Sequence, residues 1–139
     1  VVVVDKNGKV TAKGLGTAKI TISAASSANY NAASKTVTVK VTKPAPTIKV
    51  KKTSATVKYA SLKKKAQSFA LGTSVNSKGK LTYKKLTKSS VLSVSSNGRI
   101  TVKKGAKKGT YKVNIRISAA AKGNYNVGSK TVTVIVKVK

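Results

Sequence analysis

The stretch NYNAASKTVTV (Asn29–Val39) occurs almost unchanged a second time, as NYNVGSKTVTV (Asn124–Val134). Each copy begins with a polar Asn-Tyr-Asn segment and continues into alternating Thr and Val. Strict alternation of polar and apolar residues is typical of a β-strand with one buried face, and the branched side chains of Val and Thr favour strands. The repeated stretch therefore predicts a turn followed by a half-buried strand, twice in one chain.

The similarity extends beyond this stretch, because Val1–Val41 and Val91–Val136 contain the same features in the same order. That order is a strand, an Asn-Gly hairpin turn, a strand that begins near Gly-Thr, the Asn-Tyr-Asn turn and the Thr-Val strand. The Asn-Gly pairs at 7–8 and 97–98 are strong hairpin signals, since both residue types tolerate positive φ. A period of roughly 95 residues is too long for a solenoid and fits β-sandwich domains in tandem.

Further short segments with strand character, separated by Ser, Gly, Asn and Lys, lie between the two copies. They are Thr47–Lys52, Ala55–Ala60, Gln67–Leu71 and Lys80–Leu86. No segment shows a helical period over ten or more residues, and the run Lys63–Lys65 with its neighbours is compatible with a single helical turn. The sequence therefore predicts an all-β fold.

The prolines of the segment KPAP (Lys43–Pro46) mark the best domain boundary, because two prolines in four residues cannot lie inside a central strand. We predict the C-terminal half of a module at 1–43, a linker at 44–46 and a complete module at 47–139. The first module then lacks four front strands, which leaves a sheet edge and an apolar face uncovered. We expect it to pair with strands of another chain or of the second module, by strand exchange or dimer formation; the alternative is disorder.

The composition argues against catalysis and metal binding, because the side chains that such sites need are nearly missing. The chain has no His, no Cys and a single acidic residue, Asp5. General acid–base catalysis, transition-metal sites and calcium sites all depend on these groups. A Ser–Lys nucleophilic pair is compatible with the composition, but no pattern marks one. We therefore expect no enzyme activity, no cofactor and no metal.

The net charge is +29, from 30 Lys and Arg residues against one acid. Many Lys alternate with Val or Ile, which predicts the solvated face of a sheet and discourages pairing between sheet edges. The same charge attracts polyanions at low salt through counterion release. Sequence-specific nucleic-acid binding is not expected, because Arg99 and Arg116 are the only Arg residues and the few aromatic residues form no stacking pattern. No apolar stretch is long enough for a membrane span.

Candidate ligand contacts are the clustered Lys at predicted strand ends and loops, together with the Tyr of each repeated turn. They are Lys63, Lys64, Lys65, Lys84, Lys85, Lys103, Lys104, Lys107, Lys108, Tyr30 and Tyr125. The structural interpretation of the two Tyr places each ring over the end of a sandwich, with its hydroxyl bonded to the main chain as in a tyrosine corner. The alternative is an exposed platform for a sugar or for a neighbouring module.

The residues VVVVDKNGKVTAKGLGTAKITISA (Val1–Ala24), followed by the Asn-Tyr-Asn stretch, resemble the group-2 bacterial immunoglobulin-like repeats of Gram-positive surface proteins. The pattern of those repeats is a strand with a D-x-N-G turn, a V-x-A strand, G-x-G-T and a T-x-I-T strand. It falls here on Val4–Gly8, Val10–Ala12, Gly14–Thr17 and Ile20–Ile22. The second module departs from the pattern, because the residues at 103–108 replace G-x-G.

The resemblance implies immunoglobulin-like β-sandwich modules in tandem, in an extracellular protein that is secreted or held at the bacterial cell surface. It also implies a structural or adhesive role, namely spacing or presenting a binding region, or contacting a host surface protein, immunoglobulin or glycan. The alternative is a Lys-mediated polyanion-binding module for cell-wall teichoic acid, sulfated glycan or, without sequence specificity, nucleic acid.

Overall fold

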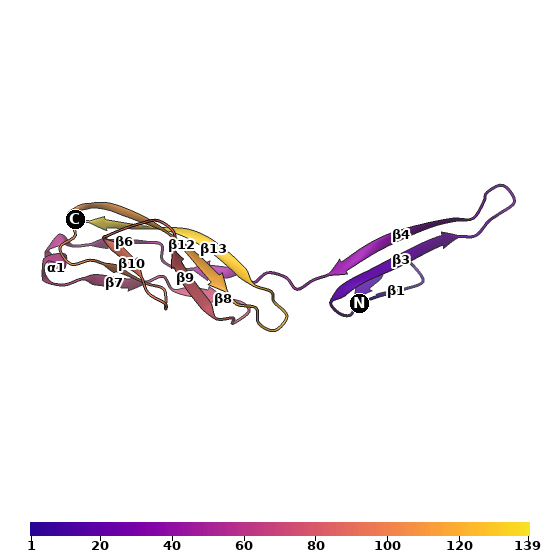
Figure 1. Cartoon of the computed structure of the whole chain (residues 1–139), viewed down its shortest axis with the longest axis horizontal. Coiled ribbons are helices and arrows are strands. Elements are labelled where there is room, and N and C mark those ends of the chain that lie inside the picture. The colour runs from indigo at the N-terminus through magenta and orange to yellow at the C-terminus, as the bar shows by residue number, and fades with distance from the viewer. The chain divides into compact units, whose positions relative to one another are not determined.

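The computed structural model of the chain describes residues 1–139 and consists almost entirely of β-strands (Figure 1). This confirms the all-β prediction. The chain divides into two units, Val1–Lys43 and Pro44–Lys139, and the division falls within the proline-containing segment KPAP. No helix of the structure has the length and apolar character that crossing a membrane requires.

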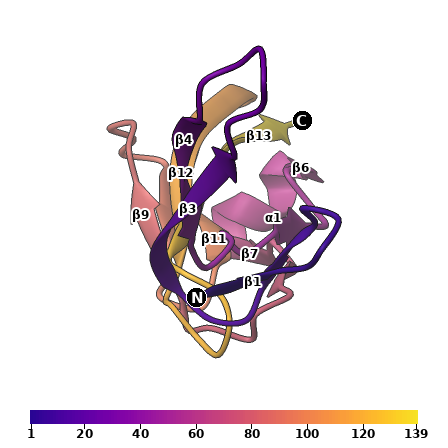
Figure 2. The ribbon, with the colours of Figure 1, turned by 90° about the vertical axis from the view of Figure 1, so that its right-hand side faces the viewer.

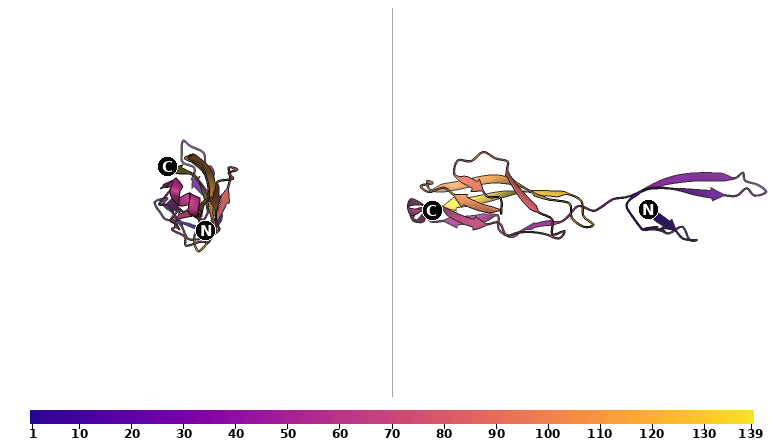
Figure 3. Two further views of the ribbon diagram at one scale, coloured as in Figure 1. Left: turned by 90° about the vertical axis from the view of Figure 1, so that its left-hand side faces the viewer. Right: turned by 60° about the horizontal axis from the view of Figure 1, so that its bottom comes forward.

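The first unit contains two antiparallel strand pairs and no fully buried side chain. Its strands are β1 (Val2–Val4), β2 (Val10–Ala12), β3 (Gly16–Ala24) and β4 (Ala33–Val41). β1 pairs with β2, and β3 pairs with β4 along nine residue pairs, which forms the long ribbon in the right panel of Figure 3. The first unit is therefore a pair of hairpins without a core of its own.

The Asn-Gly pair at 7–8 forms the predicted hairpin turn between β1 and β2. Only Gly8 has a positive φ, of 78°, and its N–H donates to the carbonyl oxygen of Asp5. The Asp5 carboxylate accepts further hydrogen bonds from the N–H groups of Asn7 and Lys9. These bonds hold Asn7 at negative φ, so that Gly alone supplies the left-handed position. The second copy repeats this geometry at Gly98.

The second unit consists of ten elements. They are β5 (Ile48–Val50), β6 (Ser54–Val57), α1 (Tyr59–Lys64), β7 (Gln67–Ala70), β8 (Thr73–Val75), β9 (Leu81–Lys85), β10 (Leu92–Val94), β11 (Arg99–Val102), β12 (Gly109–Ala119) and β13 (Gly128–Val138). The strand order of the larger sheet is β6-β13-β12-β9, and smaller sheets β10-β11-β7 and β5-β8 complete the unit. In Figure 2, α1, β7 and β11 lie to one side of β12 and β9. The unit is a sandwich-like arrangement of sheets, and its assignment as immunoglobulin-like stays a prediction.

Two local predictions in the second unit need correction. The predicted strand Ala55–Ala60 ends at Val57, because Tyr59 already begins α1, a helix of six residues. The helix carries Leu62 into the core, where its side chain is fully buried. The short strand β8 was not predicted at all, since Thr73–Val75 is too brief to show a period.

The core of the second unit forms where its sheets face each other. The inward side chains of β12 and β13 include Ile115, Ile117 and Val134, and they pack with Leu71 and Ile100 from the opposite side. All of these side chains have no exposed surface. Because burial of apolar surface is the main source of stability, this cluster holds the unit together.

The hairpin β3–β4 of the first unit repeats the hairpin β12–β13 in the same register. Ile22 lies opposite Lys35, just as Ile117 lies opposite Lys130. Directly opposite residues share one face of a sheet, so Ile22 and Ile117 are equivalent positions. Their surroundings differ completely, because Ile117 is 0% exposed and Ile22 is 60% exposed. One hairpin is covered by a second layer of strands, and its copy is bare.

Candidate functional site

Seven of the predicted ligand contacts gather at one end of the second unit, and we refer to them as the helix-end cluster. They are Lys63, Lys64, Lys65, Lys103, Lys104, Lys107 and Lys108, and all are exposed. The first three lie at the end of α1, and the other four lie in the loop between β11 and β12. The N–H of Gly105 donates to the carbonyl oxygen of Leu62 at 2.9 Å, which fastens the loop to the helix. The structure therefore brings together two Lys runs that are about 40 residues apart in the chain.

Lys84 and Lys85 are neighbours in β9, but their side chains lie on opposite faces of the sheet. Lys85 pairs with inward-facing Ile115 and is half-buried. Its ammonium donates to the carbonyl oxygens of Ser89, at 2.9 Å, and Leu92, at 3.2 Å. Lys85 thus stabilises the loop after β9, and only Lys84 is presented to a ligand.

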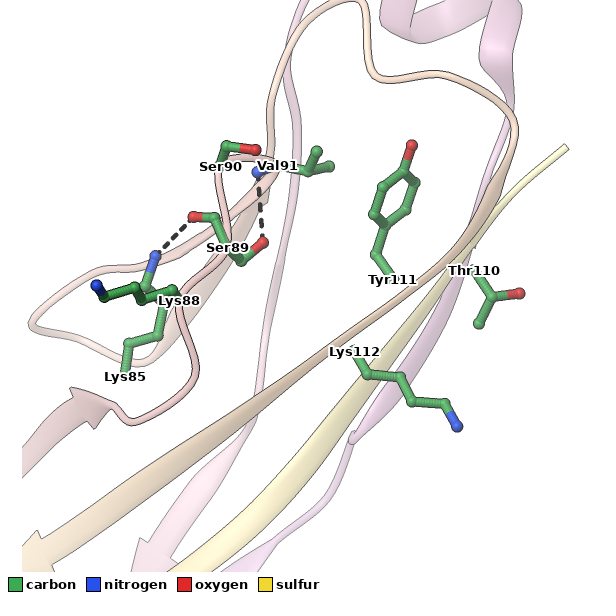
Figure 4. A pocket seen from close by; sticks show the side chains of 8 residues that line it. All are labelled: Lys85, Lys88, Ser89, Ser90, Val91, Thr110, Tyr111 and Lys112. Carbon is green, nitrogen blue, oxygen red and sulfur yellow. Dashed lines mark hydrogen bonds between the residues drawn. The ribbon is translucent and has the colours of Figure 1, made fainter.

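An open hollow of about 680 Å³ surrounds Lys85, and Figure 4 shows its lining. The lining residues are Lys85, Lys88, Ser89, Ser90, Val91, Thr110, Tyr111 and Lys112. The hydroxyl oxygen of Ser89 accepts hydrogen bonds from the N–H groups of Val91 and Leu92. The Lys88 and Lys112 side chains extend in different directions, so the cations do not converge on one point (Figure 4). This hollow is better explained as a fixed loop than as a ligand site.

The two Tyr of the repeated turns do not occupy tyrosine corners. Tyr30 is 78% exposed, and the hydroxyl oxygen of Tyr125 accepts a hydrogen bond of 3.3 Å from the side-chain amide of Asn76 rather than from the main chain. Each Tyr instead closes a short turn through two main-chain hydrogen bonds, with Ser27 in the first copy and Lys122 in the second. The repeated Asn-Tyr-Asn stretch is thus the tip of a hairpin.

Tyr111 has the tyrosine-corner geometry that was predicted for Tyr30 and Tyr125. It lies near the start of β12, and its hydroxyl donates to the carbonyl oxygen of Lys107 at 2.9 Å. A Tyr near the start of a strand that bonds the main chain a few residues upstream is the arrangement of a tyrosine corner. The signal was available in the sequence as the Gly-Thr-Tyr start of the strand, but Tyr111 has no counterpart in the first copy of the repeat.

A further group of basic residues occupies the outward face of the β13-β12-β9 strands, and only Lys84 of this group is among the predicted ligand contacts. We call it the outer face. It includes Lys84 on β9, Lys112 and Arg116 on β12, and Lys137 on β13. The strand register places Lys84 directly opposite Arg116. Sequence alternation alone shows that such residues share an outward face, but it cannot show which residues of different strands are neighbours.

Comparison of the chain with models of known protein families gives no match, and no curated protein sequence matches it.

Proposed function

We propose that the chain is a structural and adhesive module of an extracellular bacterial surface protein, which spaces or presents a binding region. It resembles tandem surface repeats in its sequence motifs, and its single acidic side chain leaves no acid–base pair for catalysis. We therefore also propose that it is not an enzyme. The proposal is supported chiefly by the positions of the two ends of the second unit.

The two ends of the second unit lie at opposite ends of its long strands (Figure 1). At one end, the carbonyl oxygen of Pro44 accepts a hydrogen bond of 2.9 Å from Asn126 in the turn between β12 and β13. At the other end, Lys139 exchanges main-chain hydrogen bonds with Val57 and Tyr59 beside α1. The intervening strand β13 has 11 residues, which corresponds to roughly 35 Å. A unit of this kind adds length when modules follow one another.

The chain enters the unit through β5, which pairs with β8, and the next strand, β6, is hydrogen-bonded in parallel to the last strand, β13. The register joins Ser54 to Ile135 and Val57 to Val138. Because the strands are parallel, tension applied at the two ends of the unit pulls them in opposite directions along their common axis. The hydrogen bonds between them are then sheared together rather than opened one after another. This arrangement suits a module that spaces other domains under load.

Proline substitutions in β6 test this function. The carbonyl oxygens of Thr53 and Val57 accept hydrogen bonds from the N–H groups of Ile135 in β13 and of Lys139 just after it. The main-chain groups of the odd-numbered residues of this edge strand therefore point toward β13, and those of Thr56 point away. Ala55→Pro removes one N–H from the parallel ladder, whereas Thr56→Pro removes an N–H that points to solvent. One lost hydrogen bond of this kind predicts roughly 2- to 10-fold faster unfolding at a given force for Ala55→Pro.

The measurement is single-molecule pulling of the full chain between folded marker domains. We expect one clear unfolding event for the second unit. Its unfolding force is expected to be lower for Ala55→Pro and unchanged for Thr56→Pro. Unfolding of the unmodified second unit without a resolvable force peak would contradict the spacer function. Equal effects of both substitutions would show that β6 and β13 are not the strands that resist the force.

Polyanion binding is a second candidate function, and the charge distribution favours it. The chain has 30 basic residues and one acidic residue, and every residue of the helix-end cluster is exposed. Such a surface releases condensed counterions when it meets a polyanion. The test is binding to heparin, teichoic acid, DNA and host proteins at low and at physiological salt. Binding to one host protein or glycan that persists at physiological salt would support adhesion instead. Binding to polyanions at low salt that is lost entirely at physiological salt would support the polyanion function.

A further inference from the structure

Lys84 and Arg116 form a cross-strand pair of like charges on the outer face. They are directly opposite each other in the antiparallel ladder of β9 and β12. Like charges in this position destabilise a sheet. The only acidic side chain of the chain, Asp5, is engaged in its own turn, where its carboxylate accepts hydrogen bonds from the N–H groups of Asn7 and Lys9. No acidic side chain of the chain is therefore available to offset the charge of this pair.

The first copy of the repeated hairpin has a neutral side chain at the position of Arg116. Arg116 lies opposite Thr131 in the second unit, and the equivalent pair in the first unit is Thr21 and Thr36. The two Thr hydroxyl oxygens are 3.3 Å apart, so a neutral hydrogen bond fills the position that Arg116 takes in the second copy. The second copy thus carries a cation, Arg116, at a position where the first copy has the neutral Thr21.

A hollow of about 520 Å³ next to the turn between β12 and β13 is lined by Arg116 of this pair, whereas Lys84 lies outside its lining. Its polar lining consists of Lys80, Thr82, Arg116, Ser118 and Ser129, and the other half of the lining is Ala45, Ala119, Ala120, Val127 and Gly128. One guanidinium nitrogen of Arg116 donates to the Ser129 hydroxyl oxygen at 3.4 Å, which orients the side chain toward the hollow. Two cations and three hydroxyls from adjacent strands therefore border a single space.

This set of groups matches one ligand chemistry. A guanidinium presents a planar fork to a tetrahedral oxyanion, and ammonium groups add positive charge beside it. Hydroxyl groups exchange hydrogen bonds with the hydroxyls of a sugar or polyol. No aromatic side chain lines the hollow, so it offers no surface on which a nucleic-acid base could stack. The volume lies in the usual range for small-molecule sites.

We propose that this part of the outer face binds the sulfate- or phosphate-bearing sugar or polyol unit of an anionic polymer. The inference rests on the polyanion-binding candidate function and deepens it, because it places the site on the sheet rather than in the helix-end cluster. Arg116 holds the oxyanion, Lys80 and Lys84 neutralise neighbouring charges, and Thr82, Ser118 and Ser129 bind hydroxyl groups of the ligand.

The test compares two double variants of the full chain that lose the same charge, Lys84→Gln with Arg116→Gln and Lys64→Gln with Lys104→Gln. Binding is measured at about 0.15 M salt, separately with a heparin hexasaccharide and with a poly(glycerol phosphate) oligomer of equal charge. We expect the outer-face variant to bind about 10- to 100-fold more weakly and the helix-end variant less than about 3-fold more weakly. The two ligands show whether sulfate or phosphate is preferred.

Substitution Arg116→Lys separates a positioned site from general attraction, because it keeps the charge and removes the fork. A loss of affinity at unchanged salt dependence supports the site. Equal losses in both double variants, or an Arg116→Lys variant that binds like the unmodified chain, would overturn the inference while leaving polyanion binding intact. Failure of the unmodified chain to bind either oligomer would overturn the candidate function itself. Lys84 and Arg116 are both exposed. Removing their like charges is expected to leave the midpoint of the unfolding transition unchanged or to raise it.

Discussion

Affinity of the chain for long heparin or polyphosphate is expected to fall by about 1,000- to 100,000-fold between 50 and 200 mM salt. This range applies to a protein that makes roughly 6–10 contacts with charged groups of a polymer. The helix-end cluster, Lys84 and Arg116 together supply enough exposed cations for that number of contacts. The reason for the loss is that added salt removes the entropy gained when bound counterions are released.

The measurement is a series of binding isotherms at four or more salt concentrations, with neutral dextran as the control polymer. The slope of log affinity against log salt gives the number of ion contacts. Affinity that changes by less than about threefold over this range would contradict a mainly electrostatic surface. Such a result would favour specific adhesion to one partner.

Substitution Ile117→Ala is expected to lower the free energy of unfolding of the second unit by about 2–5 kcal/mol. Ile117 is fully buried in the core between the sheets, so that its truncation removes buried apolar surface and leaves a cavity. A loss of this size is a large share of the stability of a domain of this length. Chemical denaturation followed by tyrosine fluorescence and circular dichroism measures it.

The repeat provides the matched control, Ile22→Ala. Ile22 occupies the equivalent position of the bare hairpin, opposite Lys35, and most of its side chain is exposed. Its truncation is expected to change the main unfolding transition by less than about 0.5 kcal/mol. A large effect of Ile22→Ala would show that the face of β3–β4 is covered in solution, and a small effect of Ile117→Ala would contradict the described core.

Much of the fold could be predicted because the relevant signals are local. The alternation in Lys130–Lys139 and in its earlier copy predicts both strands, but the predicted half-burial occurs only in β13, since no residue of β4 is buried. The Asn-Gly pairs mark hairpins wherever they occur. The strand β8 could not be predicted with these signals, and α1 was predicted only as a single helical turn around Lys63–Lys65, because each is shorter than the window in which a period becomes visible. Their conformations depend on packing, as the burial of Leu62 illustrates.

The candidate site was less predictable than the fold, since it depends on neighbours that are distant in the chain. The Lys runs were visible as clusters, but Lys84 and Lys85 have different roles because they alternate across the sheet. The pairing of Lys84 with Arg116 needs the register of two strands about 30 residues apart, which alternation alone does not give. The tyrosine-corner role was assigned to Tyr30 and Tyr125 because their turn is repeated, whereas the bond of Tyr111 to Lys107 is local and falls outside the repeat.

Amide hydrogen exchange along the whole chain in dilute solution tests most directly the claim that Pro44–Lys139 folds as an independent spacer module. We predict strong protection in β12 and β13, and exchange close to the unprotected rate at the equivalent amides of β3 and β4, because a two-stranded hairpin is marginally stable in water. Protection of β3 and β4 that appears only at high protein concentration would support the predicted pairing with another chain. Equal protection of both hairpins in dilute solution, or weak protection of β12 and β13, would contradict the claim.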